Sequence, residues 1–387
     1  MGPIQEAVAA PGWALAPVLE WLLTTARDRA ALDPLCEGLG QRLTEAGAPV
    51  DRLRLSMRTV HPLVTGRSVV WHRDRGMEPA TATPHGLEQR PTYINSPLAI
   101  IEETRRPFRR RSSELNAGDH SLLHSLAQEG MTDYLAVPTF FAGQRRAAIV
   151  ISTRAPGGFD DGDLAKFEAL ALVAAPVLEV LRIEDVASAV AEAFIGRHSG
   201  PRVLAGRIQR GDVERIEAAI WFSDLQGWSR LANTLPPEAA VAIANGYFEI
   251  VDAAITAAGG EVLKLIGDAV LAIFTGEAQA ACRAALAAAA AAQAEASARQ
   301  ATFRFGIGLH WGEVVYGNVG SPARLDFTVM GQAVNLAARV EKLTRKLGRS
   351  VVCSEALAQA AALPMDDLGR HAVAGWDEPV GVYSPQS

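Results

Sequence analysis

The chain has 387 residues, of which 49% are apolar and 21% charged, and its formal net charge is −6. This length predicts two domains, and the composition is that of a soluble globular protein. An acidic chain is a poor candidate for nucleic-acid binding, because nucleic-acid backbones attract basic surfaces. The three cysteines, Cys36, Cys282 and Cys353, lack the spacing of a zinc or disulfide framework. This usage suits a reducing cytoplasm, where we expect the protein to work.

The sequence predicts neither a secretory signal nor a membrane span. The first residues lack the basic start and apolar core of a signal peptide. Residues 278–298 are rich in alanine, but Arg283, Gln293 and Glu295 interrupt them. We therefore expect a packed helix there.

The N-terminal half predicts a small α/β domain over residues 1–183. Apolar spacing indicates a helix over residues 13–46, and residues 156–182 predict another helix, capped by Asp160 or Asp161. Short apolar runs predict strands at residues 53–62, 67–72, 134–140 and 147–152. The end of this region resembles a GAF domain, a ligand-sensing module in which a final strand precedes a proline-containing loop and a long helix. The resemblance implies a GAF-like sensor for a small-molecule or protein effector that the sequence does not identify.

Residues 184–216 predict a helical linker. The helical pattern continues from the preceding segment and breaks near Ser199-Gly200-Pro201. Such a segment is either a transmission element or a passive tether, because a position between two domains does not by itself establish coupling.

The region over residues 217–387 predicts a ferredoxin-like α+β domain. Pro236-Pro237 opens its first long helix and Gly259-Gly260 closes it. Two strand–helix–strand units around an antiparallel hairpin are typical of this fold. The expected elements are strands at 218–224, 261–266, 269–274 and 303–311, helices at 236–258 and 278–298, and a strand and a helix through residue 345.

Two isolated aspartates lie where apolar strands of this domain end. Asp224 ends the first strand, and Asp268 lies at the tip of the hairpin 261–274, so the two side chains can meet. A buried carboxylate needs a partner, because an unpaired buried charge is unfavourable. A divalent cation between them is one solution, since Mg²⁺ is usually held by carboxylates and substrate phosphates. A turn or N-cap role for either aspartate is the alternative.

Asn335 and Arg339 form a second candidate motif. They are four residues apart in a helical pattern and therefore share one helix face. An amide and a guanidinium on one face suit a phosphate. The alternative is a surface Arg339 that pairs with Glu341 or Asp326.

The stretch from about Glu217 to Glu355, with these motifs in order, resembles the catalytic domain of class III nucleotide cyclases, the adenylyl and guanylyl cyclases. The resemblance implies that Asp224, Asp268 and the backbone carbonyl of Leu225 bind two Mg²⁺ or Mn²⁺ ions.

The same resemblance assigns residues to the nucleotide. Asn335 and Arg339 would orient the ribose and stabilise charge on the α-phosphate. Lys264 and Thr328 would read the base and form a pair of the adenylyl type. On the base edge that this pair would contact, guanine has a hydrogen-bond donor where adenine has an acceptor, and an acceptor where adenine has a donor. ATP is therefore favoured over GTP. The further substrate-binding positions are Phe222 and Gly227.

The resemblance also implies a homodimer with two equivalent sites. In the family, the metal-binding aspartates come from one subunit, and the base-reading and Asn–Arg residues come from the other. One sequence that carries both halves can form both sites around a twofold axis. One position departs from the family, because Ala374 stands where many members have a Lys or Arg that contacts the terminal phosphates. Either another base such as Arg370 substitutes, or phosphate affinity is weaker.

We therefore expect an adenylate cyclase that converts ATP to 3′,5′-cyclic AMP and pyrophosphate and is regulated by its N-terminal domain. One alternative is a guanylate or dual-specificity cyclase. Another is a degenerate cyclase domain that serves as a nucleotide-binding regulatory module. The complete set of candidate site residues argues against degeneration, and Ala374 argues for it.

Overall fold

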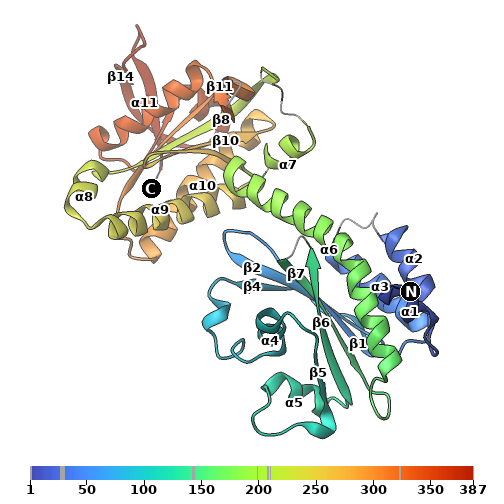
Figure 1. Cartoon of the computed structure of the whole chain (residues 1–387). Helices are drawn as coiled ribbons and strands as arrows, with labels where there is room; N and C mark the ends of the chain where they lie inside the picture. Colours follow the sequence, from blue (N-terminus) through green and yellow to red (C-terminus); the bar gives the residue numbers. More distant parts are fainter. Residues whose placement is uncertain are drawn as a thin grey trace. The chain divides into compact units, whose positions relative to one another are not determined.

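The computed structural model describes residues 2–26, 31–141, 144–197, 199–206, 209, 211–321 and 324–386. The chain divides into two compact units, Met1–Val190 and Ala191–Ser387 (Figure 1). Helix α6 (Asp161–Ile195) crosses the expected domain boundary at residues 183 and 184. The expected linker 184–216 contains the end of α6, helix α7 (Ser199–Leu204) and the start of a strand, although residues 198, 207, 208 and 210 lie outside the described part.

The N-terminal unit is built on an antiparallel sheet. Its strands follow the order β3-β2-β1-β7-β6-β5, and β4 pairs with β2. Every pair of neighbouring strands is antiparallel. The strands are β1 (Arg52–Arg58), β2 (Val64–His72), β3 (Gly76–Met77), β4 (Thr81–Pro84), β5 (Phe108–Arg111), β6 (Asp133–Phe141) and β7 (Gln144–Thr153).

Helices cover both faces of this sheet (Figure 1). Because side chains alternate along a strand, β1 sends Leu53 and Leu55 into a core with α2, α3 and α6. Strand β6 sends Tyr134 and Ala136 into a separate core with α4 and α5. The helices are α1 (Pro3–Ala9), α2 (Leu15–Leu23), α3 (Leu32–Glu45), α4 (Pro97–Thr104), α5 (Ser121–Gln128) and α6.

Two of the expected helices have different bounds. The helix expected over residues 13–46 is two helices, α2 and α3, because Pro34 lies in the first turn of α3 and a proline in a helix interior clashes with the preceding turn. The helix expected over 156–182 is α6, which begins at Asp161 after Gly157 and Gly158, both at positive φ. Asp160 is its cap, since the Asp160 Oδ1 accepts a hydrogen bond of 2.7 Å from the backbone N–H of Asp163.

The C-terminal unit is a mixed α+β structure with a sheet in the order β14-β15-β13-β11-β8-β10-β9, and β12 pairs with β11. β11 and β13 are parallel, and β8 is antiparallel to both of its neighbours. The strands are β8 (Val213–Leu225), β9 (Glu261–Ile266), β10 (Ala269–Thr275), β11 (Phe305–Ser321), β12 (Arg324–Met330), β13 (Val351–Ser354), β14 (Met365–His371) and β15 (Val380–Pro385).

Alternation along β8 again divides the core in two. Trp221 faces α9 and α10, whereas Ala218 and Ile220 face α11 and β12. The helices are α7, α8 (Trp228–Thr234), α9 (Pro237–Ala257), α10 (Ala278–Ala298), α11 (Gln332–Leu347) and α12 (Glu355–Ala361). Among the described helices, α9 alone is long and apolar enough to cross a membrane by length and composition. Its residues Tyr247, Ile250 and Val251 lie in the core, and core helices of soluble proteins pass the same test.

Candidate active site

Asp224 and Asp268 lie side by side at one edge of the C-terminal sheet. Asp224 is the penultimate residue of β8, and its partner across the ladder is Ala269, the first residue of β10. Asp268 precedes Ala269 in a turn that Gly267 makes at φ 64°, a conformation that favours glycine. Burial, together with the hydrogen bond and the negative charge of Asp268, raises the pKa of Asp224 to about 7.

The donor set of this pair fits a divalent cation. The Oδ1 atom of Asp224 is buried and has no hydrogen-bond partner. A buried acceptor of this kind is rare, because it loses its hydration without compensation. In the described residues, no group of three or more His, Cys, Asp or Glu could hold a metal ion. A cation at Asp224 and Asp268 would therefore complete its shell with other oxygens, such as those of a phosphate substrate.

A third acid, Glu341, lies behind the pair on α11. It is 6% exposed, and burial followed by the negative charge of Asp224 raises its pKa to about 7. Helix α11 presses closely onto β11 because two glycines face it. A Cβ atom on Gly306 would lie 2.8 Å from the Glu341 Oε1, and one on Gly308 would lie 2.3 Å from the Glu341 backbone nitrogen.

We expect Gly308→Ala to displace α11 from the sheet. Its Cβ would meet the backbone of Glu341 and Ala337 at 2.3 and 2.5 Å, where no side-chain rotation relieves the clash. Overpacking of this kind destabilises a protein by about 1–3 kcal/mol. The matched control is Gly246→Ala in α9, whose Cβ would lie 3.6 Å from Phe303 and should stabilise the helix by about 0.5–1 kcal/mol. Urea denaturation of the three proteins measures the difference, and equal stabilities would contradict the close packing.

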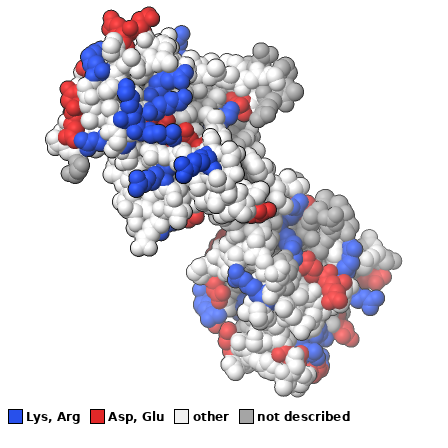
Figure 2. All heavy atoms as spheres, turned by 90° about the vertical axis from the view of Figure 1, so that its left-hand side faces the viewer, with Lys and Arg blue, Asp and Glu red and all other residues white. Residues whose placement is uncertain are grey.

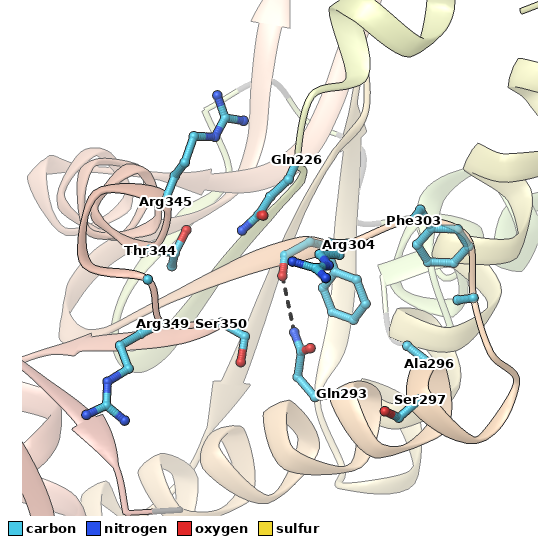
Figure 3. A pocket seen from close by; sticks show the side chains of 13 residues that line it. Gln226, Gln293, Ala296, Ser297, Phe303, Arg304, Thr344, Arg345, Arg349 and Ser350 are labelled. Carbon is cyan, nitrogen blue, oxygen red and sulfur yellow. Dashed lines mark hydrogen bonds between the residues drawn. The ribbon is translucent and has the colours of Figure 1, made fainter.

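A pocket of about 480 Å³ opens beyond the end of β8 that carries Asp224, and neither Asp224 nor Asp268 is among its lining residues. Three arginines from different elements line it: Arg304 before β11, Arg345 in the last turn of α11, and Arg349 after it (Figure 3). Gln226 joins the pocket to Asp224, two residues earlier, and its backbone N–H bonds the Arg304 carbonyl at 2.8 Å. The positive charge of Arg345 also acts on Asp224. Figure 2 shows Lys and Arg side chains gathered on one face of the C-terminal unit.

The sequence analysis missed these arginines. β11 runs antiparallel to β8, so the start of β11 lies beside the end of β8 that carries Asp224. A basic residue just before β11 was therefore the available signal for Arg304. Arg370, the substitute considered for Ala374, donates a hydrogen bond of 2.7 Å to the Pro379 carbonyl and lies 3.7 Å from Glu355.

The expected base-reading residues lie on β9 and β12. The Lys264 Nζ forms an ion pair of 2.6 Å with Asp326, and both side chains are about two-fifths exposed. Thr328 is two residues further along β12, on the same face as Asp326, and is 9% exposed. The structure thus brings Lys264 close to the strand that carries Thr328, and Asp326 orients the Lys264 ammonium group.

The other expected site residues have the following positions. Asn335 and Arg339 both lie on α11; Asn335 is exposed and Arg339 half-buried. Phe222 packs partly against the core under α11, and Leu225 is buried at the end of β8. Gly227 follows in a turn at φ 77° and precedes α8. The roles of these residues in metal and substrate binding stay predictions.

Adjoining carboxylates beside a basic pocket are typical of proteins that bind phosphate-bearing substrates with divalent cations. The family model "Adenylate and Guanylate cyclase catalytic domain" matches residues 213–375. An adenylate cyclase of Anabaena cylindrica is 31% identical over 190 residues, 46% of this chain and 38% of that protein. Adenylate cyclase 1 of Rhizobium meliloti is 34% identical over 153 residues, 37% of this chain and 23% of that protein. The solved adenylyl cyclase CyaB from P. aeruginosa is 26% identical and covers 46% of this chain and 96% of its own, with a TM-score of 0.42.

The C-terminal unit therefore contains an adenylate and guanylate cyclase catalytic domain, over residues 213–375. The chain spans 38% and 23% of the lengths of the two curated relatives.

Proposed function

We propose that this protein is an adenylate cyclase that converts ATP to 3′,5′-cyclic AMP and pyrophosphate at a homodimer interface, under regulation by the N-terminal unit. The observation that carries the proposal is the Asp224–Asp268 pair, with its buried unpaired Oδ1, beside the basic pocket of Arg304 and Arg345. Both features lie within the region that matches the cyclase domain.

The chemistry needs the ribose 3′-hydroxyl deprotonated and held in line with the α-phosphorus. A bond forms from this oxygen to the α-phosphorus, the bond to the bridging oxygen breaks, and pyrophosphate leaves. Two Mg²⁺ or Mn²⁺ ions held by Asp224, Asp268 and the Leu225 carbonyl would lower the pKa of the ribose 3′-hydroxyl and neutralise the charge of the phosphates. Arg339 donates hydrogen bonds to the charge that develops on the α-phosphate, and Asn335 orients the ribose.

The arginines of the basic pocket would take the place of the basic residue that is missing at Ala374. Arg304 and Arg345 supply two permanent positive charges to this pocket, and the charge of Arg345 acts on Asp224. We propose that they contact the β- and γ-phosphates of a nucleotide held by the acid pair. Arginine forks match phosphate oxygens bidentately. The pocket therefore favours an active enzyme over a degenerate cyclase domain.

A dimer is supported by the charges around Asp224. Glu341 on α11 is buried, and its charge and that of Asp224 act on each other, so this face of α11 is turned toward the acid pair. Arg339 is two residues before Glu341 and therefore lies on a different face of the helix. We therefore propose that Asn335, Arg339, Lys264 and Thr328 serve the acid pair of the partner subunit rather than that of their own chain.

The N-terminal unit is proposed as a sensor with a GAF-like fold. Its last strand, β7, is followed by a loop that contains Pro156 and by the long helix α6, as in the resemblance above. For the C-terminal unit we propose the ferredoxin-like arrangement, with α9 between β8 and β9 and α10 between β10 and β11. The three cysteines are free and buried, which is consistent with a cytoplasmic location.

The direct test is to incubate the pure protein with ATP or GTP and Mg²⁺ or Mn²⁺ and to identify the products by mass. Cyclic AMP and pyrophosphate from ATP support the proposal. Preferential formation of cyclic GMP favours the guanylate or dual-specificity alternative. Nucleotide binding without any cyclic product favours the regulatory-module alternative.

We expect a change at the base-reading positions to shift preference from ATP toward GTP. The variant combines Lys264→Glu and Thr328→Cys with Asp326→Asn, because a glutamate at position 264 would otherwise face the Asp326 carboxylate within ion-pair distance. Each buried polar group that loses its match costs about 1–3 kcal/mol, which changes relative kcat/KM by roughly fivefold to a hundredfold. Asp326→Asn alone is the control and should keep the ATP preference. A wild type that already prefers GTP would contradict the assignment.

A further inference from the structure

A row of polar side chains crosses the sheet of the N-terminal unit. Arg52 on β1 lies directly opposite His72 on β2 and Ser152 on β7. Ser152 lies opposite Tyr134 on β6, and Tyr134 lies opposite Arg110 on β5. Residues directly opposite each other in neighbouring strands share a sheet face. These five side chains, which we call the polar row, therefore cross five adjacent strands on the face covered by α4 and α5 (Figure 1).

The polar row is buried, but several of its polar atoms have no hydrogen-bond partner within the protein. Arg52 is 8% exposed, and His72, Ser152 and Tyr134 are each less exposed than that. The His72 Nδ1, the Ser152 Oγ and the Arg110 Nε are buried without a hydrogen-bond partner. Buried polar atoms in folded proteins are nearly always hydrogen-bonded, so three unpaired atoms in one row require an explanation.

A second arginine extends the row. Arg54 is two residues beyond Arg52 on β1 and therefore faces the same side. Its Nη2 donates a hydrogen bond of 2.9 Å to the Ser68 Oγ, but its Nε is buried and unpaired. The hydroxyl of Tyr134 lies near both guanidinium groups, since their charges lower its pKa against the larger effect of burial.

The acids nearby leave the two central arginines unpaired. Glu78 pairs with His72 at 2.6 Å at one end of the row, and Asp119 pairs with Arg110 at 2.9 Å at the other. Glu129, whose charge reaches Arg52, lies 3.6 Å from Arg75. Within the described residues, neither Arg52 nor Arg54 forms an ion pair with a carboxylate. Burial lowers the pKa of both guanidinium groups, because the charged form has lost its hydration.

We propose that the polar row is a binding site for a small molecule that carries a carboxylate or phosphate oxyanion, held by Arg52 and Arg54. Two guanidinium groups present planar donor forks that match such oxyanions bidentately. Ser152, Tyr134 and His72 add neutral groups that can bond the rest of the ligand. The anion supplies a direct ion-pair partner for two buried guanidinium groups, on which the more distant charges of Glu78 and Glu129 otherwise act. The site does not depend on the cyclase activity proposed above.

The test is a calorimetric titration of the full chain with inorganic phosphate and with succinate, against chloride at equal ionic strength. We expect the wild type to bind at least one of the two probes, and Arg52→Met and Arg54→Met each to weaken that binding at least tenfold. The control is Arg42→Met on α3, an exposed residue paired with Glu45, which should bind like the wild type. Binding of phosphate to the basic pocket of the C-terminal unit is common to all four proteins, so it cancels in the comparison.

Thermal unfolding in anion-free buffer separates a binding role from a structural one. If the arginines serve a ligand, Arg52→Met and Arg54→Met remove an uncompensated buried charge and melt at the same temperature as the wild type or higher. Strong destabilisation of both variants would mean that the arginines hold the fold, and would overturn the proposal. So would the absence of binding by either probe beyond that of chloride, or equal binding by wild type and both variants.

Discussion

We expect Asp224→Asn and Asp268→Asn each to abolish the formation of cyclic AMP while the protein stays folded. An amide keeps the shape of the carboxylate but removes the negative charge that would hold a divalent cation. Loss of a metal-bound transition state should lower the rate by at least a thousandfold. Asp252→Asn, an exposed residue of α9, is the matched control and should keep the wild-type rate. Activity above a few per cent in both site variants would contradict the assignment of the two aspartates.

Stability should change in the opposite direction to activity. In the metal-free protein, burial and Asp268 raise the pKa of Asp224 from 3.8 to about 7. The folded state therefore binds this proton more tightly than the unfolded state, and stability falls as pH rises from about 4 to about 7. Asp224→Asn removes this penalty, so its melting temperature should exceed that of the wild type at pH 8 by more than at pH 5. Added Mn²⁺ should raise the melting temperature of the wild type but not of the variant.

The second large effect is recovery of activity on mixing two inactive variants. Asp268→Asn lacks the acid pair, and Arg339→Ala lacks the phosphate-binding guanidinium. If each active site takes the acids from one subunit and Arg339 from the other, a mixed dimer contains one intact site. Random exchange makes half of the dimers mixed, so roughly a quarter of wild-type activity should return.

The matched control is a mixture of Asp224→Asn with Asp268→Asn. Both changes fall in the same half of the site, so every site in the mixed dimer is defective and no activity should return. Subunit exchange is checked with differently tagged chains. Lack of recovery in the first mixture despite exchange, or recovery in the control mixture, would contradict the shared site.

Local signals predicted most of the elements of the C-terminal unit. Residues 261–266 were expected as a strand and 278–298 as a helix, and β9 and α10 have these bounds. Strand β8 was expected at residues 218–224 but begins at Val213. Its first residues are exposed and lack an apolar alternation, and they are a strand because they pair with the distant β11, where Val213 lies opposite Gly317. A partner so remote in the chain leaves no mark on the local pattern.

In the N-terminal unit, one error was avoidable and one was not. Pro34 is a local signal that excludes a single helix over residues 13–46, because a proline belongs in the first turn of a helix. By contrast, the short strand β5 (Phe108–Arg111) consists of one phenylalanine and three arginines, and it forms because it pairs with β6. The sequence analysis predicted no strand here, because three consecutive arginines show no alternation of apolar and polar residues.

The sequence by itself determined the acid pair, because one aspartate ends a buried strand and the other lies at the tip of a hairpin, and both positions follow from local pattern. The tertiary structure alone decided what surrounds them. Arg304 and Arg345 come from different elements, and only the antiparallel pairing of β8 with β11 and the packing of α11 bring them to one pocket near the end of β8. The polar row of the N-terminal unit has the same origin. Its members lie on five strands, and their common face is set by inter-strand register, which is a property of pairing between distant segments.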